Sequence, residues 1–218
     1  MFKFEKLVFG DLGWGDEFLF ATLMTITVSI LSMGLGLCLA IVTVWAKLIT
    51  NKITRLIANF YTTVVRGVPE LLVIYLIFFG GNTVVMSIAK LFGYNGYIEL
   101  NALTIGTIAI AFISATYSSE VLRAAYLAVN KGQIEAAKAL GLNKFQIFFK
   151  VMGPQILRHA LPGIGNVWQI TLKDTSLISV TGLVEIMRQT RIASNVEHSP
   201  LTFLVTAALL YLFLTTFS

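Results

Sequence analysis

The sequence predicts an all-α membrane protein with five transmembrane helices, and three observations support this. Hydrophobic residues make up 56% of the 218 residues. Charged residues make up only 12%, whereas a soluble domain carries about 25%. The apolar residues are also grouped in uncharged runs close to the roughly 18 residues that a spanning helix needs. The runs are 18–46, 71–89, 100–119, 159–172 and 199–218, the fourth being long enough only with Lys173 and Asp174 included.

The chain is expected to have a short polar lead, residues 1–17, and one transmembrane domain, residues 18–218. The lead contains acidic residues and lacks an apolar core followed by small residues, so no cleavable signal peptide is predicted. Four small residues in the first span would let another helix approach closely, although small residues are also simply tolerated inside helices. They are Ser29, Ser32, Gly34 and Gly36.

The basic residues predict the orientation in the membrane. Lys47, Lys52 and Arg55 follow the first span without an acidic residue, which places this loop in the cytoplasm and the amino terminus in the periplasm. A polar segment at about residues 131–160, after the third span, has Glu135 as its single acidic residue and is also predicted to be cytoplasmic, as is the carboxyl terminus. Its basic residues are Lys131, Lys138, Lys144, Lys150 and Arg158.

The second apolar run has an interruption at Pro69. Proline lacks a backbone donor and disfavours helix at the residue before it, so a break is predicted near Val68. Inside a membrane such a break persists only where protein or a water-filled cavity satisfies the backbone. An external loop, residues 81–101, with an amphipathic stretch at 84–92, is expected to follow.

The polar segment at 131–160 reads as a helical hairpin. Residues 134–140 are good helix formers, and Gly141 suits a left-handed cap. The alanines in this helix leave little side-chain bulk, which favours insertion into a groove of a partner; a solvated connector without a partner is the alternative. A second helix, residues 144–152, is too apolar to lie free in water and is expected to end at Gly153 and Pro154.

These residues resemble a known family. Glu135-Ala136-Ala137, followed by Gly141, Val151 and Pro154, match the EAA signature of permease subunits of bacterial ATP-binding-cassette importers. Four further motifs resemble the polar amino acid subfamily, in particular permeases for histidine, lysine, arginine and opines, and the resemblance runs from about Phe18 to the end. These motifs are Arg66-Gly67-Val68-Pro69-Glu70, Lys131-Gly132-Gln133, Ala160-Leu161-Pro162-Gly163 and Leu172-Lys173-Asp174-Thr175-Ser176-Leu177. Three positions depart from the family pattern: Gly153 stands where a leucine is usual, Asn130 where a proline is common and Ala124 where a glycine is common.

The resemblance implies the permease fold of a type I importer in the bacterial inner membrane. The implied complex has a second permease subunit, identical or different, two ATPases and a periplasmic amino-acid-binding protein. The implied ATPase-coupling residues are Glu135, Ala136, Ala137, Gly141 and Pro154. The sequence has no GxxxxGK[ST] loop, so this chain is predicted to have no enzymatic activity and no cofactor, with ATP and Mg²⁺ in the partner ATPase. The net charge of +5 is spread between the spans and predicts no nucleic-acid partner.

Polar groups at membrane depth are the candidates for a substrate path, since a charge there costs about 2.5 to 3.5 kcal/mol on insertion scales. The candidates are Glu70, Glu120, Lys173, Asp174, Thr175 and Ser176. Glu70 and Glu120 would attract a cationic side chain. The competing structural readings are a Glu120–Arg123 pair on one helix, helix links through Lys173 and Asp174, and hydroxyl bonds to the preceding turn.

The predicted function is therefore ATP-driven import of polar, basic amino acids or opines. A permease for glutamine or glutamate is one alternative. An ion-coupled secondary transporter is another; it would explain the buried charges but not the docking hairpin. A membrane-embedded hydrolase is disfavoured, because Cys38, His159 and His198 are poor material for a nucleophile with a base or for a metal site.

Overall fold

The structure is a computed structural model that describes residues 4–10, 13–94, 96 and 101–218. Parts of the predicted lead and external loop, residues 1–3, 11–12, 95 and 97–100, lie outside the described residues. Within the described residues, four helices are long and apolar enough to cross a membrane: α1 (Gly15–Leu48), α3 (Glu70–Leu91), α4 (Ala102–Ala128) and α9 (Pro200–Phe217). The other elements are η1 (Phe4–Leu7), α2 (Lys52–Gly67), α5 (Lys131–Ala139), α6 (Lys144–Ile147), η2 (Phe148–Met152), α7 (Gly153–Asp174), η3 (Thr175–Thr181) and α8 (Ile186–Glu197).

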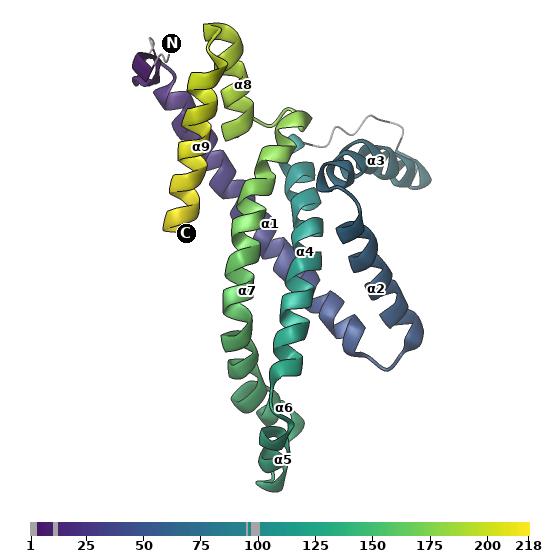
Figure 1. Cartoon of the computed structure of the whole chain (residues 1–218). Coiled ribbons are helices and arrows are strands. Elements are labelled where there is room, and N and C mark those ends of the chain that lie inside the picture. The colour runs from purple at the N-terminus through teal and green to yellow at the C-terminus, as the bar shows by residue number, and fades with distance from the viewer. Residues whose placement is uncertain (1–3, 11–12, 95, 97–100) are drawn as a thin grey trace.

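The long helices form an elongated bundle with the hairpin at one end. Helices α4 and α7 lie side by side, α1 crosses both, and α5 and α6 extend beyond the bundle at the end opposite the amino terminus (Figure 1). The fourth span, expected at about residues 162–183, does not form one α-helix, because α7 ends at Asp174 and the 3-10 turn η3 follows. Helix α7 has 22 residues, a length of about 33 Å against a hydrocarbon core of about 30 Å. Its composition is less apolar than that of the four candidate spans, so a spanning role for α7, and with it the total of five spans, stays a prediction.

Small residues allow α1 and α4 to pack closely. A Cβ atom on Gly36 would lie 2.2 Å from Ser114 Oγ and 3.1 Å from the Ala111 carbonyl oxygen. Ser32 donates a hydrogen bond of 3.1 Å across the interface to the Thr107 carbonyl oxygen. The expected close approach is confirmed at these two positions, whereas nothing lies within 4 Å of a Cβ on Gly34.

The predicted break at Val68 is confirmed. Helix α2 ends at Gly67, Val68 is extended, and α3 begins at Glu70. The prediction that residues 81–92 belong to an external loop is wrong, because α3 continues without interruption to Leu91. Gly80 and Gly81 are tolerated inside the helix, at a cost of about 1 kcal/mol each relative to alanine.

The second hairpin helix does not end at Gly153 and Pro154. Helix α6 continues as the π-helical turn η2, in which the Gly153 N–H donates to the Phe148 carbonyl oxygen, and then directly as α7. Pro154 is tolerated because it lies in the first turn of α7, where its missing N–H is not needed. A Cβ atom at position 153 would lie 3.1 Å from the Phe148 oxygen, so the glycine suits the π-helical turn.

A core at the end of the bundle opposite the hairpin joins α1, α3, α4 and η3. Its largest members, Ile74, Ile110, Ile113 and Ile178, are almost completely buried. Many other large apolar side chains are exposed, as on α9 and the outer face of α1. Such surfaces are expected where lipid, rather than water, surrounds the helices.

Candidate functional site

The hairpin is held in a defined shape by its caps. Asn130, which stands where relatives commonly have proline, caps the start of α5 by accepting a 2.8 Å hydrogen bond from the Gly132 N–H. At the other end Gly141 has φ +76°, as predicted, and the Leu142 N–H donates to the Ala137 carbonyl oxygen at 3.1 Å. These bonds satisfy backbone groups that a helix end otherwise leaves unpaired.

The predicted coupling residues lie on the free surface of the hairpin with one exception. Glu135, Ala136, Gly141 and Pro154 are exposed. Ala137 is only 4% exposed and faces the rest of the hairpin. Helix α5 is also tied to the start of α7, because Gln155 Nε2 donates to Gln133 Oε1 at 2.5 Å.

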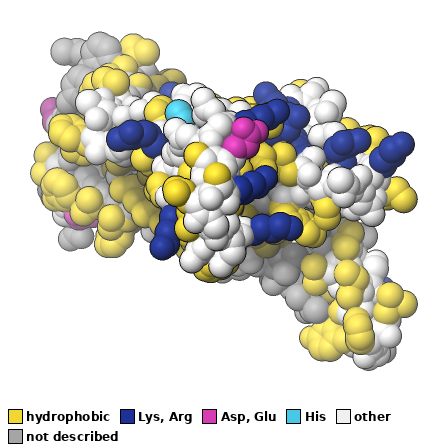
Figure 2. Space-filling model, turned by 90° about the horizontal axis from the view of Figure 1, so that it is seen from below, with side chains coloured by type: hydrophobic (Ala, Val, Ile, Leu, Met, Phe, Trp, Pro, Cys, Tyr) yellow, Lys and Arg dark blue, Asp and Glu magenta, His cyan; other side chains and the backbone are white. Residues whose placement is uncertain are grey.

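The hairpin end of the molecule is strongly basic. Viewed from this end, Lys and Arg side chains surround the hairpin with few acidic groups among them (Figure 2). Exposed apolar groups lie next to these charges: Leu140, Phe145 and Phe149 are each more than half exposed. The surface therefore combines cations with apolar anchors, which is typical of a surface covered by a partner.

A charged cluster, defined by Arg66, Glu70, Tyr117 and Asp174, lies at the break between α2 and α3. The Tyr117 hydroxyl donates to Glu70 Oε1 at 2.9 Å, and the Arg66 guanidinium lies 5.4 Å from the centre of the Tyr117 ring. Asp174, at the end of α7, is buried and lies close enough to the Glu70 carboxylate for the two acidic groups to interact electrostatically. Two predicted path residues from different helices thus meet, and Tyr117 had no sequence signal that distinguished it.

Glu120 lies in a separate polar link. Its carboxylate forms an ion pair with the Lys47 ammonium group and a longer contact, 3.7 Å, with Arg123 Nη1. Lys47 Nζ also donates to Thr62 Oγ1 at 2.7 Å. The prediction that Lys47 belongs to the loop after the first span is wrong, because it lies in the last turn of α1 and only 2% of its side chain is exposed. The cytoplasmic location of this end of the helix stays a prediction.

The remaining path candidates point in different directions. Lys173 is exposed, whereas the adjacent Asp174 is buried. Thr175 is buried and donates to the Leu172 carbonyl oxygen at 2.7 Å, the local bond named as its structural alternative. Ser176 is half-buried. The cluster therefore brings together Glu70 and Asp174, but not Glu120 or Lys173.

Glu185 is a buried carboxylate that the sequence did not single out. It caps α8 by accepting hydrogen bonds from the Met187 and Arg188 N–H groups at 2.8 and 2.7 Å, and Tyr211 of α9 donates to it at 3.0 Å. These contacts fix α8 against α9. Glutamate is not among the preferred N-cap residues, so the sequence did not predict that Glu185 caps α8.

Comparison with known proteins agrees with this arrangement. The family described as the inner membrane component of binding-protein-dependent transport systems matches residues 32–218. The chain is 49% identical over 213 residues to the nopaline transport system permease protein NocQ of Agrobacterium fabrum, covering 97% of this chain and 90% of that protein. It is 36% identical over 206 residues to the histidine/lysine/arginine/ornithine transport system permease protein HisQ of Escherichia coli, covering 94% and 90%.

A solved structure shows the same fold. The crystal structure of an amino acid ABC transporter with histidines superposes with a TM-score of 0.79 at 28% identity, covering 93% of this chain and 89% of that one. The chain therefore belongs to the family of inner membrane components of binding-protein-dependent transport systems, and it is a permease subunit of an ATP-binding-cassette transporter.

Proposed function

We propose that this permease imports cationic amino acids or opines from the periplasm to the cytoplasm. The meeting of Glu70 and Asp174 in the charged cluster is the observation that carries the substrate class. The names of the relatives, a nopaline permease and a histidine, lysine, arginine and ornithine permease, support the same class.

The chemistry of the charged cluster suits an amino acid with a cationic side chain. Carboxylates form charge-assisted hydrogen bonds with guanidinium and ammonium groups, so Glu70 and Asp174 would bind the side chain of the substrate. Arg66 and the amino-terminal end of α3, which begins at Glu70, would attract the substrate carboxylate. A glutamate side chain would instead meet two carboxyl groups of its own sign, which disfavours that alternative.

Coupling to ATP hydrolysis is proposed to run through the hairpin. Two ATPase subunits, which would bind ATP and Mg²⁺, would each receive one permease hairpin, and Glu135 would pair with a basic residue of the ATPase. A second permease chain and a periplasmic binding protein complete the proposed complex. The exposed position of Glu135 and Ala136 and the basic surroundings of α5 support this role.

The experiment compares two single neutralisations in the reconstituted complex. Uptake of labelled arginine and glutamine is measured for Glu70→Gln, in the charged cluster, and for Glu120→Gln, in the Lys47 link. Because a charge-assisted hydrogen bond contributes about 1.5 to 3 kcal/mol, Glu70→Gln should lower arginine uptake about 10- to 100-fold relative to glutamine uptake. Glu120→Gln should lower both equally. Equal loss of both substrates in Glu70→Gln would refute the path role of the charged cluster.

A further inference from the structure

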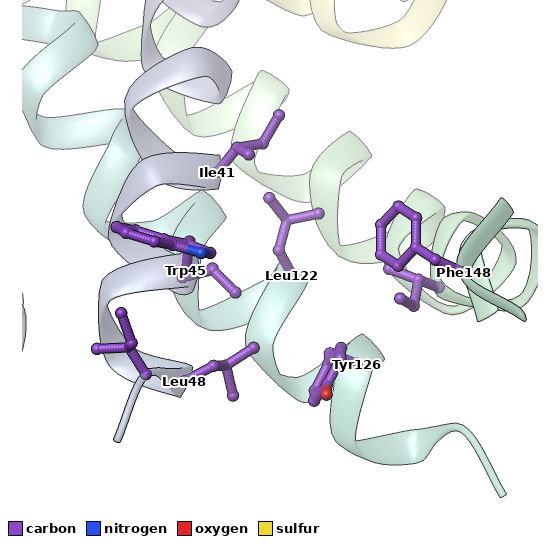
Figure 3. Close-up of a pocket in the computed structure, with 9 residues that line it drawn as sticks. Ile41, Trp45, Leu48, Leu122, Tyr126 and Phe148 are labelled. Carbon is purple, nitrogen blue, oxygen red and sulfur yellow. The ribbon is translucent and has the colours of Figure 1, made fainter. Parts of the chain in front are cut away.

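An apolar groove lies between the bundle and the hairpin. It has a volume of about 410 Å³, within the range of about 300–1,000 Å³ found for ligand pockets. Its walls come from the end of α1, the last turns of α4, and the connection from η2 to α7 (Figure 3). Its lining residues are Ile41, Val44, Trp45, Leu48, Ile49, Leu122, Tyr126, Phe148 and Ile156.

The groove lies at the end of α1, where a membrane-spanning helix would meet the headgroups. Trp45 is 63% exposed and, with Tyr126, lies at the wall of the groove (Figure 3). Tryptophan and tyrosine are enriched at this depth of a bilayer, because the ring is apolar and its N–H or O–H is polar. Because Leu48 is the last residue of α1, a groove at this height would be reached by acyl chains from one side and by headgroups from the other.

The charge beside the groove is positive. Lys144 lies four residues before Phe148, one helical turn away, and is exposed. Arg123 lies three residues before Tyr126 on α4, and its side chain is 45% exposed; it lies 3.7 Å from the Glu120 carboxylate, which is also paired with Lys47, so this group of charges keeps a net positive charge. Figure 2 shows the same concentration of cations over the whole hairpin end. Basic residues beside an apolar pocket between transmembrane helices on the cytoplasmic side are typical of sites for anionic lipid headgroups.

We propose that this groove binds one anionic phospholipid, with an acyl chain against Trp45, Leu122 and Phe148 and the phosphate against Lys144. The apolar lining accounts for the chain, and the adjacent cations account for the headgroup. Since Phe148 and Ile156 flank the junction of the hairpin with α7, the lipid would fill the space between the spans and the coupling hairpin. This proposal does not depend on which substrate is transported.

The direct test uses Trp45 as the reporter. The full chain carries three tryptophans, so Trp14→Phe with Trp168→Phe leaves Trp45 alone. In phosphatidylcholine nanodiscs, phosphatidylglycerol brominated on its acyl chains should quench Trp45 at a several-fold lower mole fraction than brominated phosphatidylcholine. Lys144→Gln should remove this preference. Lys138→Gln, the same change on α5, should retain it.

A second measurement avoids the tryptophan replacements. Native mass spectrometry of the otherwise unsubstituted chain should show one fewer retained phosphatidylglycerol in Ile41→Trp, which fills the groove. Ile108→Trp is the matched control, because Ile108 is also an exposed isoleucine, at 49% against 62% for Ile41, and lines a different apolar groove between α3 and α4. The proposal would be overturned if both brominated lipids quench Trp45 equally, or if neither quenches it because another protein chain covers it. It would also be overturned if Ile41→Trp and Ile108→Trp lose phosphatidylglycerol equally.

Discussion

The Lys47 ammonium group binds oxygen atoms from two other helices, the Glu120 carboxylate on α4 and Thr62 Oγ1 on α2. It thereby joins three helices near the end of the bundle that carries the hairpin. Glu120 also contacts Arg123, but this contact is longer than the one with Lys47, and the Arg123 side chain is more exposed than that of Lys47. Lys47 is thus the side chain that fixes the position of the Glu120 carboxylate.

Lys47→Met should destabilise the protein. The substitution keeps the apolar stem of the side chain but leaves Glu120 and Thr62 without their buried donor, at a cost of about 1–3 kcal/mol. Arg123→Ala removes the exposed contact to the same carboxylate and should cost less than about 1 kcal/mol. Thermal unfolding of the purified protein in detergent measures both. If the melting temperature of Lys47→Met is not lower than that of Arg123→Ala, the contacts of Lys47 with Glu120 and Thr62 contribute little to the stability of the protein.

At the scale of a helix pair, the α1–α4 contact depends on one glycine and not on its neighbour. Gly36→Ala would bring a Cβ atom against the Ser114 hydroxyl, which can rotate, and the Ala111 carbonyl oxygen, which is backbone. Overpacking of this kind costs about 1–3 kcal/mol. Gly34→Ala, in open space on the same helix, should instead stabilise α1 by about 0.5–1 kcal/mol.

Thermal unfolding of the two alanine variants in the same detergent tests this difference. The melting temperature should fall for Gly36→Ala and stay level or rise for Gly34→Ala. The same direction of change in both would mean that helix propensity, and not contact with α4, determines the effect.

The coupling helix α5 gives a functional prediction. Glu135→Lys reverses the exposed charge proposed to meet the ATPase, and Gly141→Val places a β-branched residue at φ +76°, where strain costs about 1–3 kcal/mol. Either change should leave membrane insertion intact but separate ATP hydrolysis from uptake. The ratio of ATP hydrolysed to substrate imported by the reconstituted complex should rise. An unchanged ratio with normal uptake would contradict the role of α5 as a lever.

Elements whose limits depend on local signals were predictable from the sequence. The span expected at residues 200–217 matches α9, because Pro200 marks where the uncharged run can begin as a helix. The break at Val68 follows from the backbone restrictions that Pro69 imposes on the residue before it. The π-helical turn at 148–152 was not predictable, because it depends on how α6 is joined to α7. The partners of Lys47 and Glu70 were also hidden, since helices far apart in the sequence supply them.

At the scale of the whole molecule, the bundle separates two ends of different character. The basic hairpin lies at one end, and the amino terminus and α8 lie at the other (Figure 1). Such asymmetry is expected of a membrane protein under the positive-inside rule. It predicts that α5 is cytoplasmic and that α8 is periplasmic.

Labelling from each side of the membrane tests this orientation. Cys38 is exposed and is first replaced by alanine. Two variants then carry one thiol each, Lys138→Cys on α5 and Val196→Cys on α8. The native Val196 side chain is 61% exposed. A membrane-impermeant maleimide should label position 196 in spheroplasts and position 138 in inside-out vesicles. Labelling of position 138 from the outer face would place the hairpin away from any cytoplasmic ATPase, and the coupling mechanism would then have no physical route from ATP to the spans.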